Sequence, residues 1–469
     1  KGGRGGEVIG LVELRICGEP ARLVVQEEKE EVREDSPSST LVLVSAHLNR
    51  TRLRSVATSS SQPSAFRIHP ITPIRGVNLG GWFIPEKWMN PSFSNYTSLK
   101  DASLCNVVKF NHSLAQQAMA AHLEAWLSEQ DFAQMAAAGF NSVRLPVGYW
   151  NLLDPEPSTA PRSEPSNTPT SDVDAEADAG TDAGAATPDS HSVHGPFAPS
   201  ASISLPYIDW AFDMAHRHGL SVLLDLHGLP GSQNGLESSG CSGSDSGSGS
   251  GNGSGSDSGS GGVHWLDTTL SVDLTLQAVQ VMAERYGQHP ALTGFELANA
   301  PALSYCTSQF PKLLDVYHRA YKAVRLRCKM CSVVFNEINP ACYELWGSHL
   351  REPRYYNVLM DIHLYDFTEL QPESESAALA HDLFAHAAIA LAWEVLISNL
   401  MQMHPVLVGE WSFAGGAGQP FVNACVNAFK SSWGWYVWTW KVDKLGVGGF
   451  DEWDVKLQYE MPDGLRVEL

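Results

Sequence analysis

Residues 207–227 read YIDWAFDMAHRHGLSVLLDLH, and this stretch contains one complete unit of the pattern that decides the fold. Its first part, Tyr207 to His218, carries apolar residues at spacings of three and four, which is typical of a helix with one buried face. Its second part, Leu220 to Leu226, is a short apolar run that predicts a strand ending at His227. Units of this kind, repeated along a chain, indicate a parallel sheet with helices packed against it.

The same alternation recurs from Arg75 onward and predicts an α/β protein. Eight strands separated by helices are what a (β/α)8 TIM barrel requires, and we expect that fold. The predicted strands are Arg75–Leu79, Asn141–Pro146, Leu220–Leu226, Gly294–Asn299, Ser332–Asn336, Tyr356–His363, Pro405–Gly409 and Gly434–Trp440. The predicted helices are Leu123–Ala138, Tyr207–His218, Leu270–Tyr286 and Ala377–Leu400.

The rest of the chain divides around this barrel. Residues 1–65 are a short N-terminal extension of unknown role, and residues 66–469 hold the barrel. Residues 155–200 are rich in Pro, Ser, Thr, Ala and Asp, and residues 238–262 are almost entirely Gly and Ser. Such compositions cannot bury enough apolar surface to order themselves, so we expect two disordered loop insertions. Each follows a predicted strand and therefore emerges at the carboxyl ends of the strands, the active face of such barrels.

Composition excludes two classes of partner. The chain has 469 residues with 31 Lys and Arg against 52 Asp and Glu, a formal net charge of −21. Nucleic acids and anionic membrane surfaces both require clustered positive charge, so we expect neither as a partner. No run of about 18 apolar residues exists, so no membrane span is expected.

Glycosylation motifs and cysteine spacing indicate where in or outside the cell the protein functions and whether it binds a metal. Asn-x-Ser/Thr motifs at Asn49, Asn95, Asn111 and Asn252 favour a secreted or cell-wall protein. Cys328-Lys-Met-Cys331 has the spacing of a zinc knuckle, but no second ligand pair follows, so two thiols flanking a buried strand is the preferred interpretation. We expect a monomer with no metal and no cofactor.

Polar residues stand where the predicted strands end, which is where barrel enzymes place functional groups. Glu410 is the sharpest of them, because the apolar run from Pro405 to Gly409 delivers one carboxylate to the barrel mouth, and buried carboxylates are costly unless used or paired. Trp438 and Trp440 alternate along the last strand and are expected on one face, where a flat ring could receive a sugar. The complete set is Glu86, Arg144, His227, Asn299, His363, Tyr365, Glu410 and Trp438.

Five ordered blocks resemble the signature blocks of glycoside hydrolase family 5, and most closely its exo-β-1,3-glucanase (glucan 1,3-β-glucosidase) branch. The blocks are GVNLGGW (76–82), VRLPVGYW (143–150), DLHGLPGSQNG (225–235), VHWL (263–266) and GWYVWTWK (434–441). The resemblance implies a retaining mechanism on β-glucosides, with Glu410 as nucleophile and a Glu in an Asn-Glu-Pro motif after strand four as acid/base. It further implies sugar-binding or nucleophile-orienting roles for Glu86, Arg144, His227, Asn299, His363, Tyr365 and Trp438.

The chain departs from this family at one decisive position. Residues 294–301 read GFELANAP, so Ala300 stands where the acid/base Glu is expected. A methyl group can neither donate nor accept a proton. Glu296 lies four residues earlier on the same strand, about 13 Å too deep at ~3.3 Å per residue, which leaves Glu337 after strand five as the better substitute. The change to Ala300 is either engineered or natural, and Ala298, which also departs from the family block, favours a natural loss.

Two functions remain open on this evidence. The chain is either a hydrolase that releases glucose from β-1,3-glucan or a small β-glucoside, with activity impaired by Ala300, or a glucan-binding pseudoenzyme. In both cases the expected ligand is a β-glucan or a β-glucoside.

Overall fold

A computed structural model describes most of the chain. The described residues are 7–16, 19–27, 73–93, 104, 112–154, 200–240, 263–302, 308–337, 342–366, 375–414, 418–443 and 451–467. Two strands of the N-terminal extension, β1 (Glu7–Ile16) and β2 (Glu19–Glu27), pair in antiparallel fashion. The two insertions expected to be disordered fall almost entirely outside the described residues.

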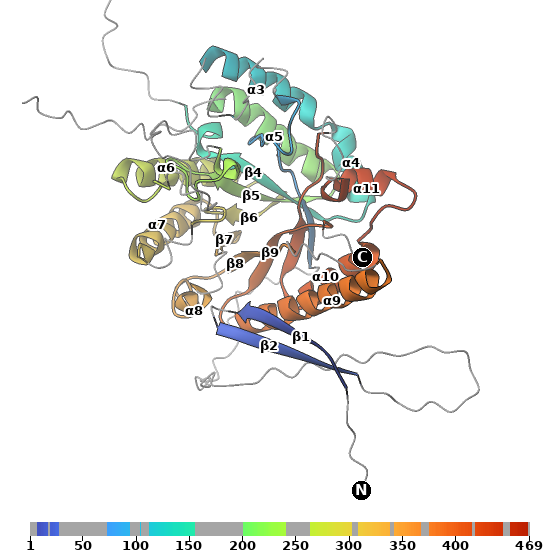
Figure 1. Cartoon of the computed structure of the whole chain (residues 1–469). Coiled ribbons are helices and arrows are strands. Elements are labelled where there is room, and N and C mark those ends of the chain that lie inside the picture. Colours follow the sequence, from blue (N-terminus) through green and yellow to red (C-terminus); the bar gives the residue numbers. More distant parts are fainter. Residues whose placement is uncertain are drawn as a thin grey trace, which may run out of the picture.

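The described part of the chain after residue 72 forms a closed parallel barrel, so the predicted (β/α)8 class is confirmed (Figure 1). The strands follow one another around the barrel in chain order, and the last pairs with the first. They are β3 (Ile74–Asn78), β4 (Ser142–Gly148), β5 (Ser221–Gly228), β6 (Leu292–Glu296), β7 (Ser332–Asn336), β8 (Val358–His363), β9 (Val406–Trp411) and β10 (Gly434–Val437).

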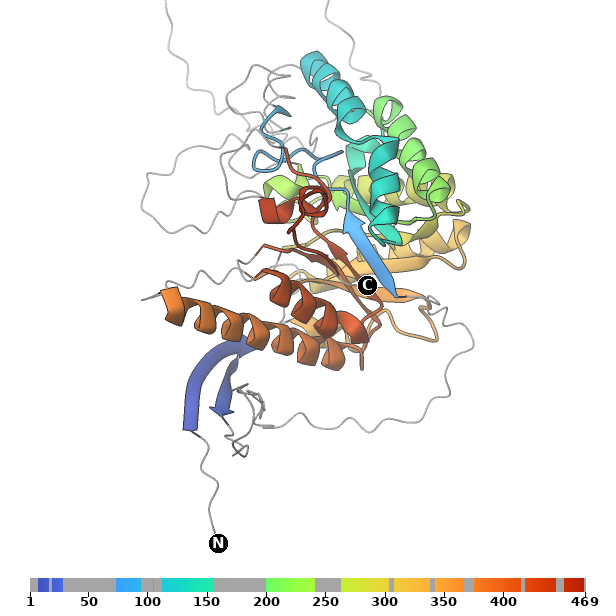
Figure 2. The same cartoon turned by 90° about the vertical axis from the view of Figure 1, so that its right-hand side faces the viewer.

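Helices surround this barrel, and α9 and α10 lie side by side along one flank (Figures 1 and 2). They are α3 (His112–Trp126), α4 (Glu129–Ala137), α5 (Ala201–Arg217), α6 (Thr269–Tyr286), α7 (Phe310–Arg327), α8 (Tyr343–Trp346), α9 (Glu375–Leu400), α10 (Gly418–Ala428) and α11 (Val455–Glu460). Short 3-10 turns are η1 (Tyr149–Asn151), η2 (Glu237–Ser239), η5 (Phe429–Ser431) and η6 (Asp451–Trp453). Among the described helices, none combines the length and apolarity that crossing a bilayer would take.

The helix predicted over Leu123–Ala138 is two helices in the structure. The break lies at Ser128, which begins α4 with a capping box. The Ser128 backbone N–H and hydroxyl both donate to the Asp131 carboxylate, at 2.8 and 2.7 Å. A Ser followed three residues later by a carboxylate is a helix-start signal, and it interrupts an otherwise continuous apolar periodicity.

The barrel interior is layered, because alternate strand residues point inward. The layer nearest the amino ends of the strands is apolar and includes Leu223, Val334 and Leu407. The Tyr436 ring fills this layer and its hydroxyl lies 2.8 Å from the Ser142 hydroxyl. The next inward-facing layer lies two residues closer to the carboxyl ends of the strands. All of its residues except one glycine are polar. These positions are Asn78, Arg144, Asp225, Glu296, Asn336, Asp361 and Gly409, and they form the floor of the candidate site.

Candidate active site

The guanidinium of Arg144 is the centre of the site. It is completely buried on β4, and carboxylates from four other strands surround it. Burial alone would lower the pKa of Arg144, but these carboxylates raise that pKa well above its ordinary value. Its nitrogen atoms lie 2.8 Å and 3.0 Å from the oxygens of Glu296, 2.8 Å from Glu410 Oε1, 3.0 Å from Asp225 Oδ2, 2.8 Å from Asn299 Oδ1 and 3.0 Å from Asn78 Oδ1.

Glu410 is held by a second group of contacts besides Arg144. The Tyr365 hydroxyl donates to Glu410 Oε2 at 2.8 Å, and His363 Nδ1 lies 3.4 Å from the same oxygen. Burial would raise the pKa of Glu410, but the charges of His363 and Arg144 outweigh it and lower that pKa. The carboxylate is therefore ionised and oriented at neutral pH, with a small part of its surface exposed.

A bulge in β9 aims Glu410 into the barrel. His363 pairs with Glu410 on one side of β9, whereas the residue before His363 pairs with Val408, so one extra residue is inserted in β9. The pairing with β10 shifts at the same place. Both Gly409 and Glu410 therefore face inward, and Trp411 returns to the outer layer, where it packs on Trp435. A Cβ at Gly409 would overlap the Asp361 carboxylate, so this inward position needs glycine.

His363 and Asp361 extend the charge network along β8. His363 Nε2 lies 3.2 Å from Asp361 Oδ2, and Asn336 donates to the same oxygen at 3.0 Å. Burial lowers the pKa of His363, but the negative charges of Glu410 and Asp361 raise it by more than burial lowers it. The net shift of this pKa is upward. The imidazolium form adds a second positive charge beside the nucleophile candidate.

Glu296 differs from Glu410 and Asp361 in the direction of its pKa shift. Burial, together with the negative charges of Asp225 and Asp361, raises its pKa well above the ordinary value despite the bidentate contact with Arg144. Ligand atoms of Glu296, Asp361 and His363 lie within 4.8 Å of one another, a spacing that could hold a metal ion. The donor set does not fit a cation, because Arg144 already engages both Glu296 oxygens and the raised pKa of His363 favours a proton on its ring.

His227 and Trp438 line another side of the mouth. His227 Nδ1 lies 2.6 Å from Asp225 Oδ2, and Asn299 Nδ2 lies 3.2 Å from His227 Nε2. An Nδ1–H bonded to Asp225 leaves Nε2 to accept from Asn299, which defines the tautomer. The Trp438 ring stacks over His227 with centroids 5.8 Å apart and an interplanar angle of 16°.

Trp440 does not share the face of Trp438, and the expectation that both would lie together is wrong. Strand β10 ends at Val437, so strand alternation does not extend to these residues. Trp440 is buried in the outer core, and its indole N–H donates to Asp131 at 3.0 Å.

Glu86 lies at the mouth in the loop after β3. Its Oε2 accepts from the indole N–H of Trp88 at 2.9 Å. Burial raises the pKa of Glu86 to about 8, the indole contact opposes that shift, and the charges of Glu237 and Glu410 add to it. Glu86 is therefore largely protonated at neutral pH and can donate as well as accept a hydrogen bond.

Ala300 follows Asn299 in the turn after β6. Its φ of 41° lies in the left-handed region, which non-glycine residues rarely adopt. Its side chain is half-buried. Residues in sparsely populated backbone conformations cluster at functional sites, and Asn299 beside it contacts both Arg144 and His227.

Glu337 does not point toward this mouth. Its Oε2 accepts from the Trp346 indole N–H at 3.0 Å, and the Trp346 ring packs on Phe335 in the outer layer between barrel and helices. Asn336 occupies the inward position of β7, so strand alternation turns Glu337 outward. The structure gives no support for Glu337 as a substitute acid.

Sequence reasoning missed several residues of the site. Asp225 and Asp361 each stand two positions before a predicted histidine on the same strand, so period-two alternation could have found them. Glu237, whose charge acts on Glu86 and whose Oε1 accepts from the Lys87 backbone N–H at 2.9 Å, follows the block at 225–235 closely. The rings of Trp88 and Trp453 pack 5.5 Å apart near Tyr365, a proximity set only by the fold.

Comparison with known proteins gives concordant results. The cellulase (glycosyl hydrolase family 5) family model matches residues 107–444, more than half of the chain. A glucan 1,3-beta-glucosidase of Blumeria graminis is 26% identical over 426 residues, covering 79% of this chain and 82% of that protein. A probable glucan 1,3-beta-glucosidase A of Aspergillus niger is 25% identical over 430 residues, covering 81% and 85%. The crystal structure of a rutinosidase from Aspergillus niger shares the fold, with a TM-score of 0.57 at 17% identity over 83% of this chain and 97% of that one.

Replacing Arg144 by Met should destabilise the protein strongly. The substitution leaves the surrounding carboxylates buried without their cation, a change that typically costs about 3–5 kcal/mol. Arg319→Met is the matched control, because Arg319 pairs with Asp273 on the surface at 3.1 Å and its loss should cost less than about 1 kcal/mol. Urea denaturation at pH 7 measures the loss in free energy of unfolding for both variants. Equal midpoints for the two variants would contradict a central role for Arg144.

Glu86 should make stability depend on pH between about 4.5 and 8. The unfolded chain ionises Glu86 near its ordinary value of 4.5, whereas the folded protein keeps the proton to about pH 8. Stability contributed by the protonated form is thus complete below pH 4.5 and declines as pH rises through this window, by up to about 1.4 kcal/mol per unit. Glu86→Gln should reduce the decline, and the surface variant Glu284→Gln should not. Thermal melts at half-unit pH steps measure how the melting temperature depends on pH. The same dependence in the wild type and in Glu86→Gln would refute the role of Glu86.

Proposed function

Because this chain belongs to glycosyl hydrolase family 5, we propose that it binds a terminal glucose unit of a β-1,3-glucan or a small β-glucoside at the barrel mouth. The names of the relatives, glucan 1,3-beta-glucosidases, support this substrate class. A secreted or cell-wall location is part of the proposal, and the Asn-x-Ser/Thr motifs of the sequence favour the secretory route.

Glu410 is the proposed nucleophile, and its contacts are the observation that carries the proposal. Arg144 binds one oxygen and Tyr365 the other, which keeps the carboxylate ionised and fixes its orientation. Attack of a Glu410 oxygen on the anomeric carbon forms a glucosyl ester and breaks the bond to the departing oxygen. His363 Nδ1 lies 3.4 Å from the Glu410 oxygen that Tyr365 contacts, and the raised pKa of His363 favours a positive charge beside it.

The surrounding residues are proposed to recognise the sugar. Trp438 offers a flat ring beneath it, stacked on His227, which is itself fixed by Asp225. Asn299, held by Arg144, presents its amide toward the 2-hydroxyl. Glu86 is proposed to grip the non-reducing end, and its protonated carboxyl allows it to donate to a hydroxyl oxygen.

Ala300 is proposed to occupy the acid/base position. The two steps that need a proton transfer, departure of the leaving group and hydrolysis of the glucosyl ester, are then slow. The departing oxygen of a natural glucoside must be protonated, and a methyl group supplies no proton. General acid catalysis typically contributes about 10²- to 10⁴-fold, so turnover of glucans should be slow. A substrate whose leaving group needs no proton can still glycosylate Glu410, but hydrolysis of the ester lacks its base.

A glucan-binding protein without turnover is the second candidate, and Ala300 is the observation that favours it. The buried network that positions Glu410 would then serve only to shape the sugar pocket.

Trapping of the glucosyl ester separates the two candidates. We expect a 2-deoxy-2-fluoro-β-glucoside with a dinitrophenyl leaving group to add one fluoroglucosyl mass, located on the peptide that contains Glu410. Glu410→Gln should show no adduct. A protein that binds glucan oligosaccharides by calorimetry yet forms no adduct within hours is a pure binder, and Glu410 is then not a nucleophile.

Restoring a carboxyl group at residue 300 should restore turnover. Ala300→Glu is expected to raise kcat on a β-1,3-linked glucose disaccharide by about 10²- to 10⁴-fold, the usual contribution of a general acid. Ala300→Gln has the same shape without the acid and should stay at the parental rate. Equal rates for the Glu and Gln variants would show that residue 300 is not the acid/base position.

A further inference from the structure

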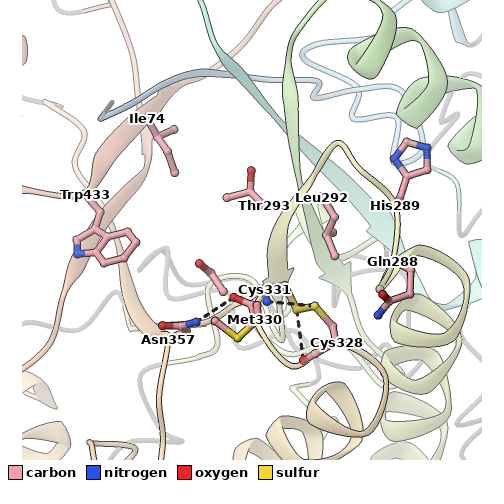
Figure 3. A pocket seen from close by; sticks show the side chains of 12 residues that line it. Ile74, Gln288, His289, Leu292, Thr293, Cys328, Met330, Cys331, Asn357 and Trp433 are labelled. Carbon is pink, nitrogen blue, oxygen red and sulfur yellow. Dashed lines mark hydrogen bonds between the residues drawn. A yellow bond between two sulfur atoms is a disulfide. The ribbon is translucent and has the colours of Figure 1, made fainter. Parts of the chain in front are cut away.

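A cavity of about 400 Å³ lies at the opposite end of the barrel from the candidate active site (Figure 3). Its position follows from its lining residues, which stand at the amino ends of strands. Ile74, Leu292 and Ser332 are the first residues of β3, β6 and β7, and Asn357 and Trp433 directly precede β8 and β10. Nothing in the glycosidase proposal uses this end of the molecule.

A disulfide between Cys328 and Cys331 forms part of the cavity wall (Figure 3). The two cysteines join the end of α7 to the start of β7, and their residues are 5% and 8% exposed. The sequence predicted two thiols flanking a buried strand, whereas the structure joins them in a disulfide that precedes β7.

Three polar side chains of the cavity wall are engaged with the protein itself. Asn357 donates to the Met330 carbonyl oxygen at 2.9 Å, and Gln288 donates to the Arg327 carbonyl oxygen at 2.7 Å. His289 Nδ1 accepts from the Ala291 backbone N–H at 3.2 Å. Besides the hydroxyl-bearing residues Thr293 and Ser332, the wall presents the disulfide, which is the one covalently reactive group among the lining residues.

A structural role accounts poorly for this bridge. The stabilisation that a disulfide provides rises with the length of the chain segment that it closes, because it removes entropy from the unfolded state. Cys328 and Cys331 are only three positions apart, so the bridge closes one of the shortest possible loops.

Arg325 makes the two sulfur atoms unequal. Its Nη1 lies 3.9 Å from Cys331 Sγ and donates to the Cys331 carbonyl oxygen at 2.9 Å. Its guanidinium is fixed between the rings of Tyr321 and Tyr356, with its carbon 4.7 and 4.6 Å from the ring centres. A fixed positive charge beside Cys331 Sγ stabilises the thiolate and makes this sulfur the better leaving group.

We propose that Cys328 and Cys331 form a thiol–disulfide exchange site that takes a low-molecular-weight thiol through this cavity. The small size of the reactant follows from the burial of both sulfurs, which a bulky protein surface could not reach, and from a cavity volume suited to small ligands. The incoming thiolate attacks Cys328 Sγ, forms a mixed disulfide and releases Cys331 Sγ as a thiolate beside Arg325.

A second molecule of thiol completes the exchange. Its thiolate attacks the small-molecule sulfur of the mixed disulfide, which releases Cys328 and the oxidised small disulfide. Two electrons pass from the two thiols to the protein disulfide, and the two thiol protons end on the cysteines. The reverse sequence, with an oxidised small disulfide as the oxidant, restores the bridge.

Reduced glutathione at millimolar concentration is the probe, applied to the oxidised full chain without denaturant. Iodoacetamide labelling and peptide mass spectrometry should show Cys328 and Cys331 becoming reduced in the folded protein. A pair that stays oxidised under these conditions, yet is reduced once guanidinium unfolds the chain, is a structural bridge and overturns the proposal.

Trapping of the mixed disulfide tests the order of events. After brief treatment of the oxidised protein with reduced glutathione and an acid quench, peptide mass spectrometry should find the glutathione adduct on Cys328, with at least about tenfold less on Cys331. An adduct found equally on either cysteine contradicts the assignment of Cys328 as the attacked sulfur.

Arginine variants test the leaving group. Arg325→Gln should slow reduction by roughly tenfold, because the thiolate loses its fixed counter-charge. Arg325→Lys keeps the charge and should keep most of the rate. Arg327→Gln is the matched control at the same helix end, since Arg327 pairs with Glu284 on the surface at 2.7 Å. Equal rates for the Arg325→Gln and Arg327→Gln proteins, with both folded by circular dichroism, refute the role of Arg325.

Discussion

The buried guanidinium of Arg144 links the strands at the carboxyl end of this barrel. Arg144 contacts the side chains of Asn78, Asp225, Glu296, Asn299 and Glu410, which come from four different strands and the turn after one of them. A cluster of buried carboxylates without a cation would repel itself, and burial of an unpaired charge is among the costliest changes in a protein. The network limits this cost in two ways. The pKa of Glu296 is raised and that of His363 is raised as well, and both shifts reduce the excess of negative charge around Arg144.

This division of protons also determines what the site can do. The same positive charges that stabilise the buried anions lower the pKa of Glu410 and leave it ionised, while its small exposed surface faces the mouth. Glu86, outside the reach of Arg144 and beside other acids, has its pKa raised to about 8 instead. Two glutamates at one mouth thus carry opposite protonation states because their neighbours differ. The proposed loss at Ala300 removes a proton donor without disturbing this network, which is why sugar binding and the first chemical step could survive it.

The two ends of the barrel carry separate chemistries in this view. The carboxyl ends of the strands hold the charge network, and the amino ends hold a cavity with a disulfide in its wall. An apolar layer built on Leu223, Val334, Leu407 and the ring of Tyr436 lies between them and excludes water from the barrel axis. The inner layers of a barrel are packed solid, so the two ends can change independently.

The sequence by itself determined the barrel and several of the polar residues at its mouth. Apolar runs alternating with amphipathic helices predict parallel strands, and polar residues such as Arg144, His227 and Glu410 at strand ends are visible without coordinates. Only the tertiary structure decided which way side chains turn where strict alternation fails. The bulge at Gly409 brings Glu410 inward, and the early end of β10 separates Trp440 from Trp438. Glu337 is the opposite case, because regular alternation after Asn336 turns it toward Trp346. Protonation likewise depends on distances between strands far apart in sequence. The local sequence pattern predicts which residues lie at an end of the barrel. The partners of these residues depend on strand register and packing, which involve residues far apart in the sequence.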